Sequence, residues 1–308
     1  MTSILQYVSK TLLMSEHELL AFALSAPHRY KKYYIKKRTG GGFRLIAQPS
    51  KETKFIQKVV VEKLRQLLPI HRCAMAYEKG TGIRLNALHH KDNRYLLKMD
   101  FSDFFPSVTP SLFFLASADC GIEFCDSDKK FLSSILFFKL NRESRLRLSI
   151  GAPSSPFVSN FVMYRFDEIT STYCFENKIN YTRYADDITF SSNVKNLLFN
   201  LPTIVKRNLR QTTLNLVKIN RAKTIFSSKA FNRHVTGVVL ANDATLSLGH
   251  DKKRLYSSMI HKFSLGQLQE EKRLHLKGLL SHSLYIEPEF LNRMKEKYSS
   301  EVIDNIFR

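Results

Sequence analysis

The sequence of 308 residues predicts an α+β fold. Segments with strand and helix patterns are mixed along the chain, without the regular alternation that builds a parallel sheet. Apolar and aromatic runs bounded by turn residues, such as INYTRYADDITFSS at 179–192, are typical of antiparallel hairpins. A hydrophobic content of 44% is enough for a sizeable core.

In chain order, the patterns predict a helical start over 1–26, a β-hairpin over 33–50 and an amphipathic helix over 51–68. One face of that helix is expected to carry Phe55, Val59, Val60, Leu64 and Leu67. A buried strand over 95–99 is expected to end at Asp100. Residues 151–169 are expected to form a Gly/Pro loop that leads into a long helix. Two hairpins are expected, at 179–192 and 235–249, and residues 251–308 are expected to be mostly helical.

The formal net charge is +21 at pH 7, and the excess is concentrated toward the N-terminus. Residues 1–100 contain 19 Lys and Arg against 7 Asp and Glu, whereas residues 251–308 contain 11 against 8. Such an excess favours a polyanionic partner or a membrane surface. No run of 18 apolar residues is present, so neither a transmembrane helix nor a membrane partner is expected.

The stretch HRYKKYYIKKR at 28–38 interleaves aromatic and cationic residues. It suits phosphate binding with base stacking, or equally a solvated edge strand guarded by lysines, and the whole-chain charge favours nucleic acid. The N-terminus lacks a signal-peptide pattern, and Ser15 and Glu18 have capping-box spacing instead. Because no CxxC spacing occurs, free thiols in a reducing cytoplasm are favoured over a zinc site for the four cysteines, Cys73, Cys120, Cys125 and Cys174.

Three aspartates occupy strand-like surroundings, where Asp is depleted. Asp186 and Asp187 are adjacent within a hairpin pattern, and Asp100 follows a hydrophobic run. One such Asp is usually a turn or a helix cap, but three in a basic chain that attracts phosphates indicate a divalent metal. Two Mg²⁺ ions about 3.5–4 Å apart can activate a hydroxyl and stabilise a leaving pyrophosphate. We therefore predict a two-magnesium site, provided that Asp100 packs beside the hairpin.

These stretches resemble the motifs of reverse transcriptases, in the order of that family. YADD at 184–187 is similar to the catalytic hairpin, and MDFSDFFPSV at 99–108 to the first aspartate motif. RLIAQPS at 44–50, GAPSSPFVSN at 151–160 and LNLVKINRAKT at 214–224 resemble three further motifs. Two short elements, NALHH at 86–90 and VTG at 235–237, are similar to elements of bacterial retron reverse transcriptases.

The resemblance implies a right-hand polymerase whose antiparallel palm sheet carries the catalytic aspartates. It implies an N-terminal helix and fingers over 1–95, a palm over 96–245 with a fingers insertion at about 115–150, and a helical thumb over 246–308.

The resemblance also implies roles for individual residues. Asp100, Asp186 and Asp187 would be catalytic metal ligands, Phe101 would add its backbone carbonyl, and Lys223 would protonate the pyrophosphate unless it is a surface lysine. Arg44 would bind the triphosphate, Phe105 would exclude a ribose 2′-OH unless it only packs in the core, and Gly151 would let the backbone approach the nucleotide. RNA contact is implied for Asn86, His90, Val235, Thr236 and Gly237, although Asn86 and His90 could instead cap the junction of fingers and palm.

One position departs from the family pattern. Many relatives have Gln before the loop glycine, whereas this chain has Ile150, which offers no side-chain hydrogen bond. Nucleotide discrimination or affinity is therefore expected to differ, and Ser154, Ser155 and Asn160 remain as polar contacts.

A retron enzyme copies part of its own structured noncoding RNA with dNTPs, starting from the 2′-OH of an internal guanosine. The product is branched multicopy single-stranded DNA, cellular RNase H trims the template, and an effector or toxin from the same locus often links the system to antiphage defence. The alternatives are a bacterial defence reverse transcriptase with untemplated synthesis, an idle RNA-binding scaffold, or a generic basic RNA-binding protein. The NALHH and VTG elements oppose the first alternative, and the three acids oppose the other two.

Overall fold

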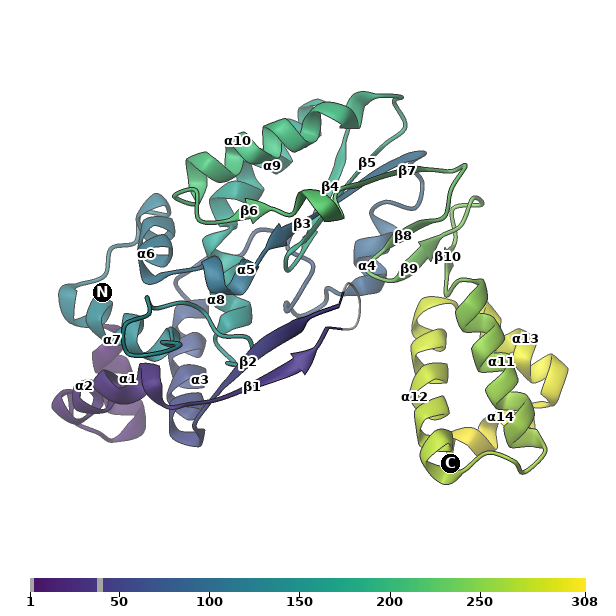
Figure 1. Cartoon of the computed structure of the whole chain (residues 1–308), viewed down its shortest axis with the longest axis horizontal. Helices are drawn as coiled ribbons and strands as arrows, with labels where there is room; N and C mark the ends of the chain where they lie inside the picture. Colours follow the sequence, from purple (N-terminus) through teal and green to yellow (C-terminus); the bar gives the residue numbers. More distant parts are fainter. Residues whose placement is uncertain (1–2, 38–40) are drawn as a thin grey trace.

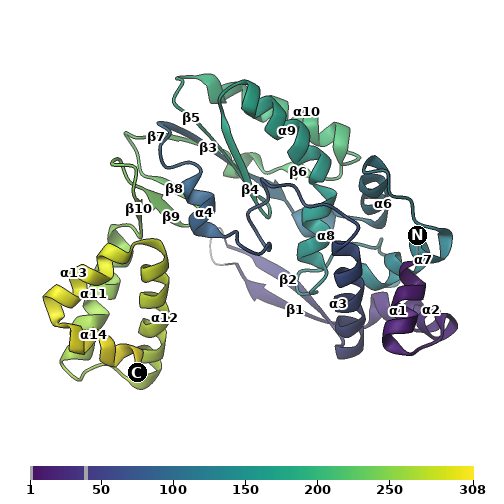
Figure 2. The same ribbon diagram turned by 180° about the vertical axis from the view of Figure 1, so that it is seen from behind.

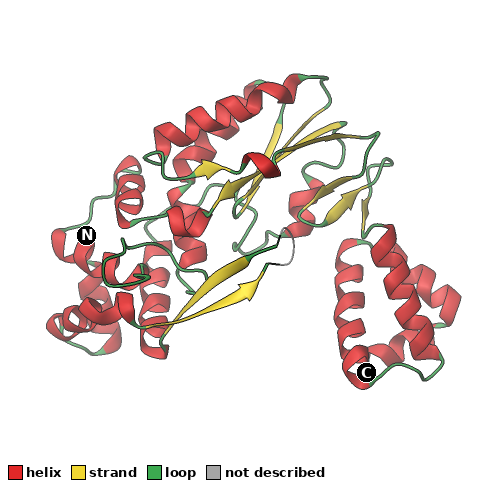
Figure 3. Cartoon of the chain, in the orientation of Figure 1, coloured by secondary structure: helices red, strands yellow, loops and turns green. Residues whose placement is uncertain are grey.

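The computed structural model describes residues 3–37 and 41–308 and shows helices combined with antiparallel sheets (Figures 1 and 3). The described strands form sheets of two, five and three strands, and every neighbouring pair within them is antiparallel. The predicted α+β class is therefore confirmed.

The N-terminal part consists of helices packed beside a two-stranded hairpin. Ser15 and Glu18 form the predicted capping box at the start of the second helix. The predicted hairpin is present, although residues 38–40 of its turn, and with them Arg38, lie outside the described residues. The elements are α1 (Ile4–Leu12), α2 (Glu16–Ser25), η1 (Ala26–His28), β1 (Tyr30–Lys36), β2 (Phe43–Pro49), α3 (Lys51–Arg65) and α4 (Ile83–Leu88).

The buried face of α3 differs from the predicted one at its first residue. Phe55 is 59% exposed, whereas Ile56, Val60 and Leu64 are buried at intervals of four residues. The predicted face was therefore wrong at Phe55, because the helix rotates Ile56 rather than Phe55 into the core. Val59 is buried as expected.

The five-stranded sheet holds the predicted acidic hairpin. Its strand order is β4 (Asn180–Tyr184), β5 (Asp187–Ser192), β3 (Tyr95–Ser102) and β6 (Lys218–Ile219), and β7 (Ile225–Ser228) also pairs with β3. The strand around Asp100 was expected to end there, but it continues to Ser102 because β6 pairs with Phe101 and Ser102. Asp100 therefore lies inside a paired strand.

Helices cover one side of this sheet (Figures 1 and 2). The predicted long helix after the Gly/Pro loop is divided at Met163 into α8 (Ser155–Val162) and α9 (Tyr164–Glu176). α9 packs on β4, and α10 (Leu201–Thr212) packs on α9. The remaining elements of this region are α5 (Phe104–Ser107), α6 (Pro110–Asp119), α7 (Asp126–Leu136), η2 (Leu197–Asn200) and η3 (Arg221–Lys223).

The C-terminal part is helical, as predicted, and lies at the end of the molecule away from α1 and α2 (Figure 1). Four helices follow a small sheet, and both share a core that is separate from the core of the rest of the chain. No helix in the part of the chain that the structure describes is long and apolar enough to cross a bilayer. The elements are β8 (Arg233–Val235), β9 (Val238–Leu240), β10 (Leu246–Ser247), α11 (His250–Ser264), α12 (Glu270–Ile286), α13 (Pro288–Tyr298) and α14 (Ser300–Phe307).

Candidate active site

The three predicted acids gather at one end of the β3–β5 pair. Asp100 of β3 lies directly opposite Asp187 of β5 in the strand register. Asp186 lies in the β4–β5 turn, and its carbonyl accepts a hydrogen bond of 3.0 Å from the Phe101 N–H. Residues directly opposite in an antiparallel pair point to the same face of the sheet, where like charges are destabilising. The fold therefore places two carboxylates together at a cost to stability.

Lys223 reaches this group from the other edge of β3. That edge is divided between β6 and β7, which pair with the two ends of β3, and η3 fills the gap between them. The Asn220 N–H donates to the Asp100 carbonyl (2.7 Å), which fixes the chain just before η3. Lys223 Nζ then donates to Asp100 Oδ2 over 2.8 Å. The break in the edge strand is what brings the lysine to the acids.

The electrostatics of these groups indicate a site for a cation. Burial, followed by the charges of Asp186 and Asp100, raises the pKa of Asp187 to about 6. Burial also raises the pKa of Asp186, while the positive charges of Lys223 and Arg44 act to lower it. The hydrogen bond to Asp100 raises the pKa of Lys223, so its ammonium group remains charged at neutral pH.

These oxygens suit a hard divalent ion, which prefers carboxylate ligands. Within residues 3–37 and 41–308, however, no three or more His, Cys, Asp or Glu side chains are close enough together to hold an ion. Lys223 is bound to the Asp100 carboxylate, where it supplies positive charge. The donor chemistry therefore fits a metal, and ligation by all three acids requires their side chains to move closer together.

Arg44 lies on β2, and Ile150 and Gly151 lie against the same strand at Ala47. Arg44 is exposed on β2, and its charge acts on Asp186. The Ile150 carbonyl accepts a hydrogen bond of 2.9 Å from the Ala47 N–H, so this position contributes through its backbone. Gly151 has φ +124°, and a Cβ there would lie 3.2 Å from the Ala47 carbonyl oxygen. Position 151 therefore requires glycine in this structure because the backbone of β2 lies so close to it.

The aromatic residues after Asp100 differ in exposure. Phe101 and Phe104 are each 2% exposed and pack on one another with ring centroids 5.5 Å apart. Phe105 is half-buried, and its ring meets Phe104 edge-on at 5.7 Å. Phe105 alone of the three has enough exposed surface to meet a nucleotide.

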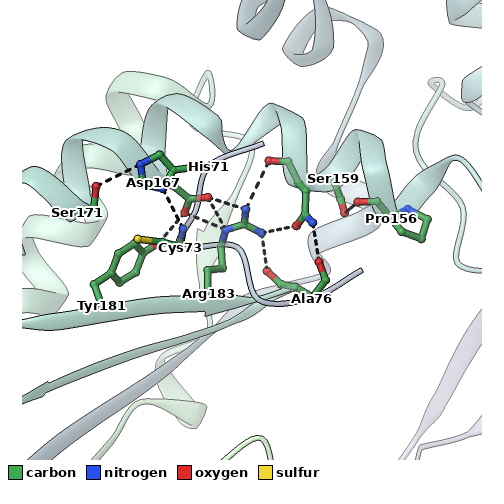
Figure 4. Close-up of polar contacts among 11 residues, drawn as sticks. His71, Cys73, Ala76, Pro156, Ser159, Asp167, Ser171, Tyr181 and Arg183 are labelled. Atoms are coloured by element: carbon green, nitrogen blue, oxygen red, sulfur yellow. Dashed lines mark hydrogen bonds and ion pairs between the residues drawn. The ribbon is translucent and has the colours of Figure 1, made fainter. Parts of the chain in front are cut away.

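A buried polar network lies beside the β4–β5 turn and was not predicted (Figure 4). Arg183 of β4 and Asp167 of α9 are both fully buried, and their ion pair spans 2.6 Å. The same guanidinium donates to Asn160 Oδ1 (3.1 Å) and to the carbonyl of Ala185 (3.2 Å). Ala185 has φ +56°, so this bond holds a strained residue immediately before Asp186.

Three side chains of the 151–160 segment were predicted to remain available as polar contacts. Asn160 is fully buried and donates to the Ala76 carbonyl (2.8 Å), so it is not available to a nucleotide. Ser154 and Ser155 are fully buried as well. The expectation that these three side chains would be accessible was wrong, because all three are buried in the core, Ser154 and Ser155 at the start of α8 and Asn160 further along it.

The NALHH and VTG elements, 150 residues apart in sequence, contact each other. Asn86 Nδ2 donates to Thr236 Oγ1 at 3.4 Å, and Thr182 donates to Asn86 Oδ1 at 2.5 Å. His90 has both ring nitrogens in hydrogen bonds, to Ser191 and Thr182 at 2.7 Å each. The elements thus tie α4 to the β8–β9 turn and to β4 and β5 of the five-stranded sheet.

This burial corrects part of the predicted RNA-binding set. Asn86 is 1% exposed, and His90 and Val235 are 0% exposed. These side chains shape the junction and have no free surface for RNA in this structure. Thr236 and Gly237, on the turn, retain exposed surface, and RNA contact by them stays a prediction.

Lys98 is a further residue near Asp100 that was not predicted from the sequence. It stands two positions before Asp100 on β3, so both side chains point to the same face. Its amino group is hydrogen-bonded to the His234 ring at 2.7 Å, and burial lowers the pKa of both groups. Nothing in the local pattern distinguishes this lysine from other lysines in a basic chain.

Comparison with known proteins agrees with this geometry. A family model described as "Reverse transcriptase (RNA-dependent DNA polymerase)" matches residues 35–240. The chain is 43% identical to the Retron Ec83 reverse transcriptase of Escherichia coli, covering 94% of this chain and 93% of that protein. It is 34% identical to the Retron Ec73 reverse transcriptase of Escherichia coli, with 91% and 90% covered.

Among solved structures, apo telomerase from Candida tropicalis matches with a TM-score of 0.50 at 13% identity. The match covers 90% of this chain and 61% of the telomerase chain, so this chain spans about three fifths of the telomerase length. At this identity the likeness concerns the fold alone.

The matched region contains the sheet and all three acids, and it defines the protein as a reverse transcriptase, an RNA-dependent DNA polymerase. Within that class, the similarity over nearly the whole length of two retron enzymes shows that the chain belongs to the retron reverse transcriptase family. Membership in this class implies a divalent metal.

Proposed function

We propose that this enzyme copies part of its own structured noncoding RNA, starting from the 2′-OH of an internal guanosine. The product would be branched multicopy single-stranded DNA joined to RNA. The observation that carries the catalytic part is the juxtaposition of Asp100 with Asp187 across β3 and β5, with Lys223 bound to Asp100. The retron-specific part is supported by the contact between the NALHH and VTG elements.

In this proposal Asp100, Asp186 and Asp187 hold two Mg²⁺ ions, with the Phe101 carbonyl as a further ligand. When bound, the ions would activate the attacking hydroxyl and neutralise charge on the triphosphate. Lys223 would leave Asp100 when the ions bind there, and its ammonium group would then protonate the departing pyrophosphate. Arg44 would bind the triphosphate through its guanidinium fork.

The surrounding residues would position and select the nucleotide. Phe105 offers its half-buried ring to exclude a ribose 2′-OH. Gly151 and Ile150 hold the loop against β2, and their backbone contact with Ala47 would keep Arg44 in register with the sheet. Nucleotide recognition at position 150 would therefore use the backbone where many relatives use a side chain.

We assign fingers to residues 1–95, palm to 96–245 with an insertion at about 115–150, and thumb to 246–308. The separate core of the C-terminal helices supports a distinct thumb. That core also includes side chains of β8, β9 and β10, so these strands would connect palm and thumb. The remaining proposed partners are dNTPs, cellular RNase H and an effector or toxin from the same locus, with a cytoplasmic, antiphage role.

The test is purification from cells carrying the native locus, followed by RNase and debranching treatment of the nucleic acid that copurifies. A discrete short DNA whose mobility shifts on debranching is expected from the wild type and should be absent from Asp100→Asn. DNA of random length would instead indicate untemplated synthesis. The same discrete DNA from Asp100→Asn at wild-type yield would show that the site is wrongly assigned.

A further inference from the structure

A continuous part of the chain carries positive charge without any compensating acid. Residues 188–242 contain nine Lys and Arg and no Asp or Glu, so all 27 acidic residues lie elsewhere. The stretch runs from β5 through α10, β6, η3 and β7 to β9. Among the Lys and Arg residues of this stretch, only Lys223 pairs with a carboxylate within the described residues.

Part of this stretch lines a groove of about 800 Å³ between α10 and the β6–η3 segment. Lys206 lies on the α10 wall, and Lys218 and Arg221 lie on the opposite wall. Arg207 and Arg210 line a neighbouring hollow along the same helix. We call these five exposed cations the α10 face.

The α10 face differs from α9 and α12, each of which compensates a cation within the helix. Arg165 pairs with Glu168 on α9, and Arg273 pairs with Glu270 on α12. None of the five cations of the α10 face is within ion-pair distance of a carboxylate in the structure as described. Cations that face one another across a groove repel, so the arrangement favours a polyanion that lies between them.

Aromatic rings lie beside the same two segments. Phe199, just before α10, meets Phe226 of β7 with ring centroids 5.2 Å apart. The two side chains are 61% and 43% exposed, which is unusual for a paired aromatic cluster. Exposed aromatic rings next to a cationic groove are typical of single-stranded nucleic-acid binding, because bases stack on the rings while phosphates meet the cations.

We propose that the α10 face binds a single-stranded segment of the noncoding RNA outside the active site. This proposal rests on the proposed function, because it takes the partner to be the RNA that the enzyme copies. Cations alone would also suit an acidic protein, but the exposed Phe199–Phe226 pair favours a partner with bases. The groove begins next to the catalytic edge, since Asn220, which bonds to Asp100, directly precedes Arg221.

The test compares Lys206→Gln/Arg210→Gln with a matched control, Lys129→Gln/Lys130→Gln, which removes two exposed cations from α7. The probe is a fluorescein-labelled 20-residue oligouridylate, and its Kd is measured from 50 to 300 mM KCl. Each lost phosphate contact lowers the slope of log K against log salt by about 0.7 for a single strand. We expect a slope smaller by about 1.4 for the α10 variant and an unchanged slope for the control.

A second variant, Phe226→Ala, should weaken oligouridylate binding without changing the salt slope. The rate of extension of a preformed oligo(dT)–poly(A) substrate at saturation should equal the wild-type rate in all variants, because the face lies outside the active site. A wild-type salt slope in Lys206→Gln/Arg210→Gln would overturn the proposal. It would also be overturned if polyglutamate displaced the probe as readily as unlabelled oligouridylate, which would indicate an acidic protein partner.

The two proposals fail separately. Absence of branched DNA from the native locus, with the salt slopes as expected, would refute the proposed function and leave a face for single-stranded RNA of another origin. Discrete branched DNA together with an unchanged slope would refute the α10 face alone.

Discussion

Asp167→Asn tests whether the buried network beside the β4–β5 turn positions Asp186. The substitution keeps the size of the side chain but removes the charge that faces Arg183 at 2.6 Å, in a place where both residues are 0% exposed. Breaking one partner of a buried ion pair costs about 3–5 kcal/mol, because the remaining charge is left uncompensated. A domain stability of about 5–15 kcal/mol would be reduced by a large fraction.

Stability alone does not separate positioning from folding, so a second variant is needed. Asp167→Leu/Arg183→Met removes the buried charges together, and such replacements are often neutral or stabilising by about 1–4 kcal/mol. This variant still lacks the bond from Arg183 to the Ala185 carbonyl, which holds a residue at φ +56°. A displacement of reacting groups by about 1 Å costs roughly 10²-fold in rate.

The assays are urea unfolding and primer extension at saturating template. We expect Asp167→Asn to lose about 3–5 kcal/mol of unfolding free energy. We expect the double variant to be folded, because it buries no unpaired charge, and to be less stable than the wild type only through the buried Tyr181, Asn160 and Ala185 groups that lose their partners. Its kcat should be lower by roughly 10²-fold, with KM for the dNTP nearly unchanged. A stable double variant that extends primers at the wild-type rate would refute the positioning role of Arg183.

Three further predictions concern single residues. Lys223→Ala should lower kcat about 10²-fold or more, and Lys223→Arg should recover little of it, because a guanidinium keeps the charge but does not give up its proton; equal rates for Lys223→Ala and wild type in single-turnover extension would contradict the role of general acid. His90 is fully buried with its pKa lowered to about 3, so the folded state cannot take up the proton that the unfolded chain binds below pH 6.5. The contribution of neutral His90 to the unfolding free energy is therefore complete above pH 6.5 and is lost as the pH falls, by about 2 kcal/mol between pH 6.5 and pH 5. If NMR showed the His90 ring of the folded enzyme taking up a proton near pH 6.5, this prediction would be disproved. Phe105→Ala should raise the incorporation of ribonucleotides relative to deoxyribonucleotides by about 10-fold or more, since a lost steric clash is worth a few kcal/mol; the ratio of kcat/KM for rGTP and dGTP measures this, and an unchanged ratio would return Phe105 to a packing role.

The sequence predicted those features that depend on local pattern. The hairpins, the Ser15–Glu18 capping box and the helical C-terminal segment are confirmed, because turn chemistry and apolar spacing act over a few residues. Packing of Asp100 beside the hairpin was a condition of the predicted metal site, and the β3–β5 register meets it. Lys223 was named from a motif, and its bond to Asp100 depends on pairing partners 123 residues apart.

Long-range packing explains what the sequence did not predict. Arg183 directly precedes the YADD run, but only the position of Asp167 on α9 makes burial of its charge possible. An Arg in an apolar strand pattern was an available sign of a buried pair, although its partner could not be named. For His90 the sequence left open both RNA contact and a structural cap, and its burial depends on hydroxyl groups from β4 and β5.

β3, the strand that carries Asp100, contributes side chains to both hydrophobic cores. Leu97, Met99 and Phe101 belong to the core under the helices, whereas Leu96 points the other way into the core that includes the C-terminal helices. Two such cores can melt as separate cooperative units, and hydrogen exchange would then reveal two classes of opening. β3 pairs with β5, β6 and β7, so its amides should stay protected when the C-terminal unit melts first, and they should open with the core under the helices.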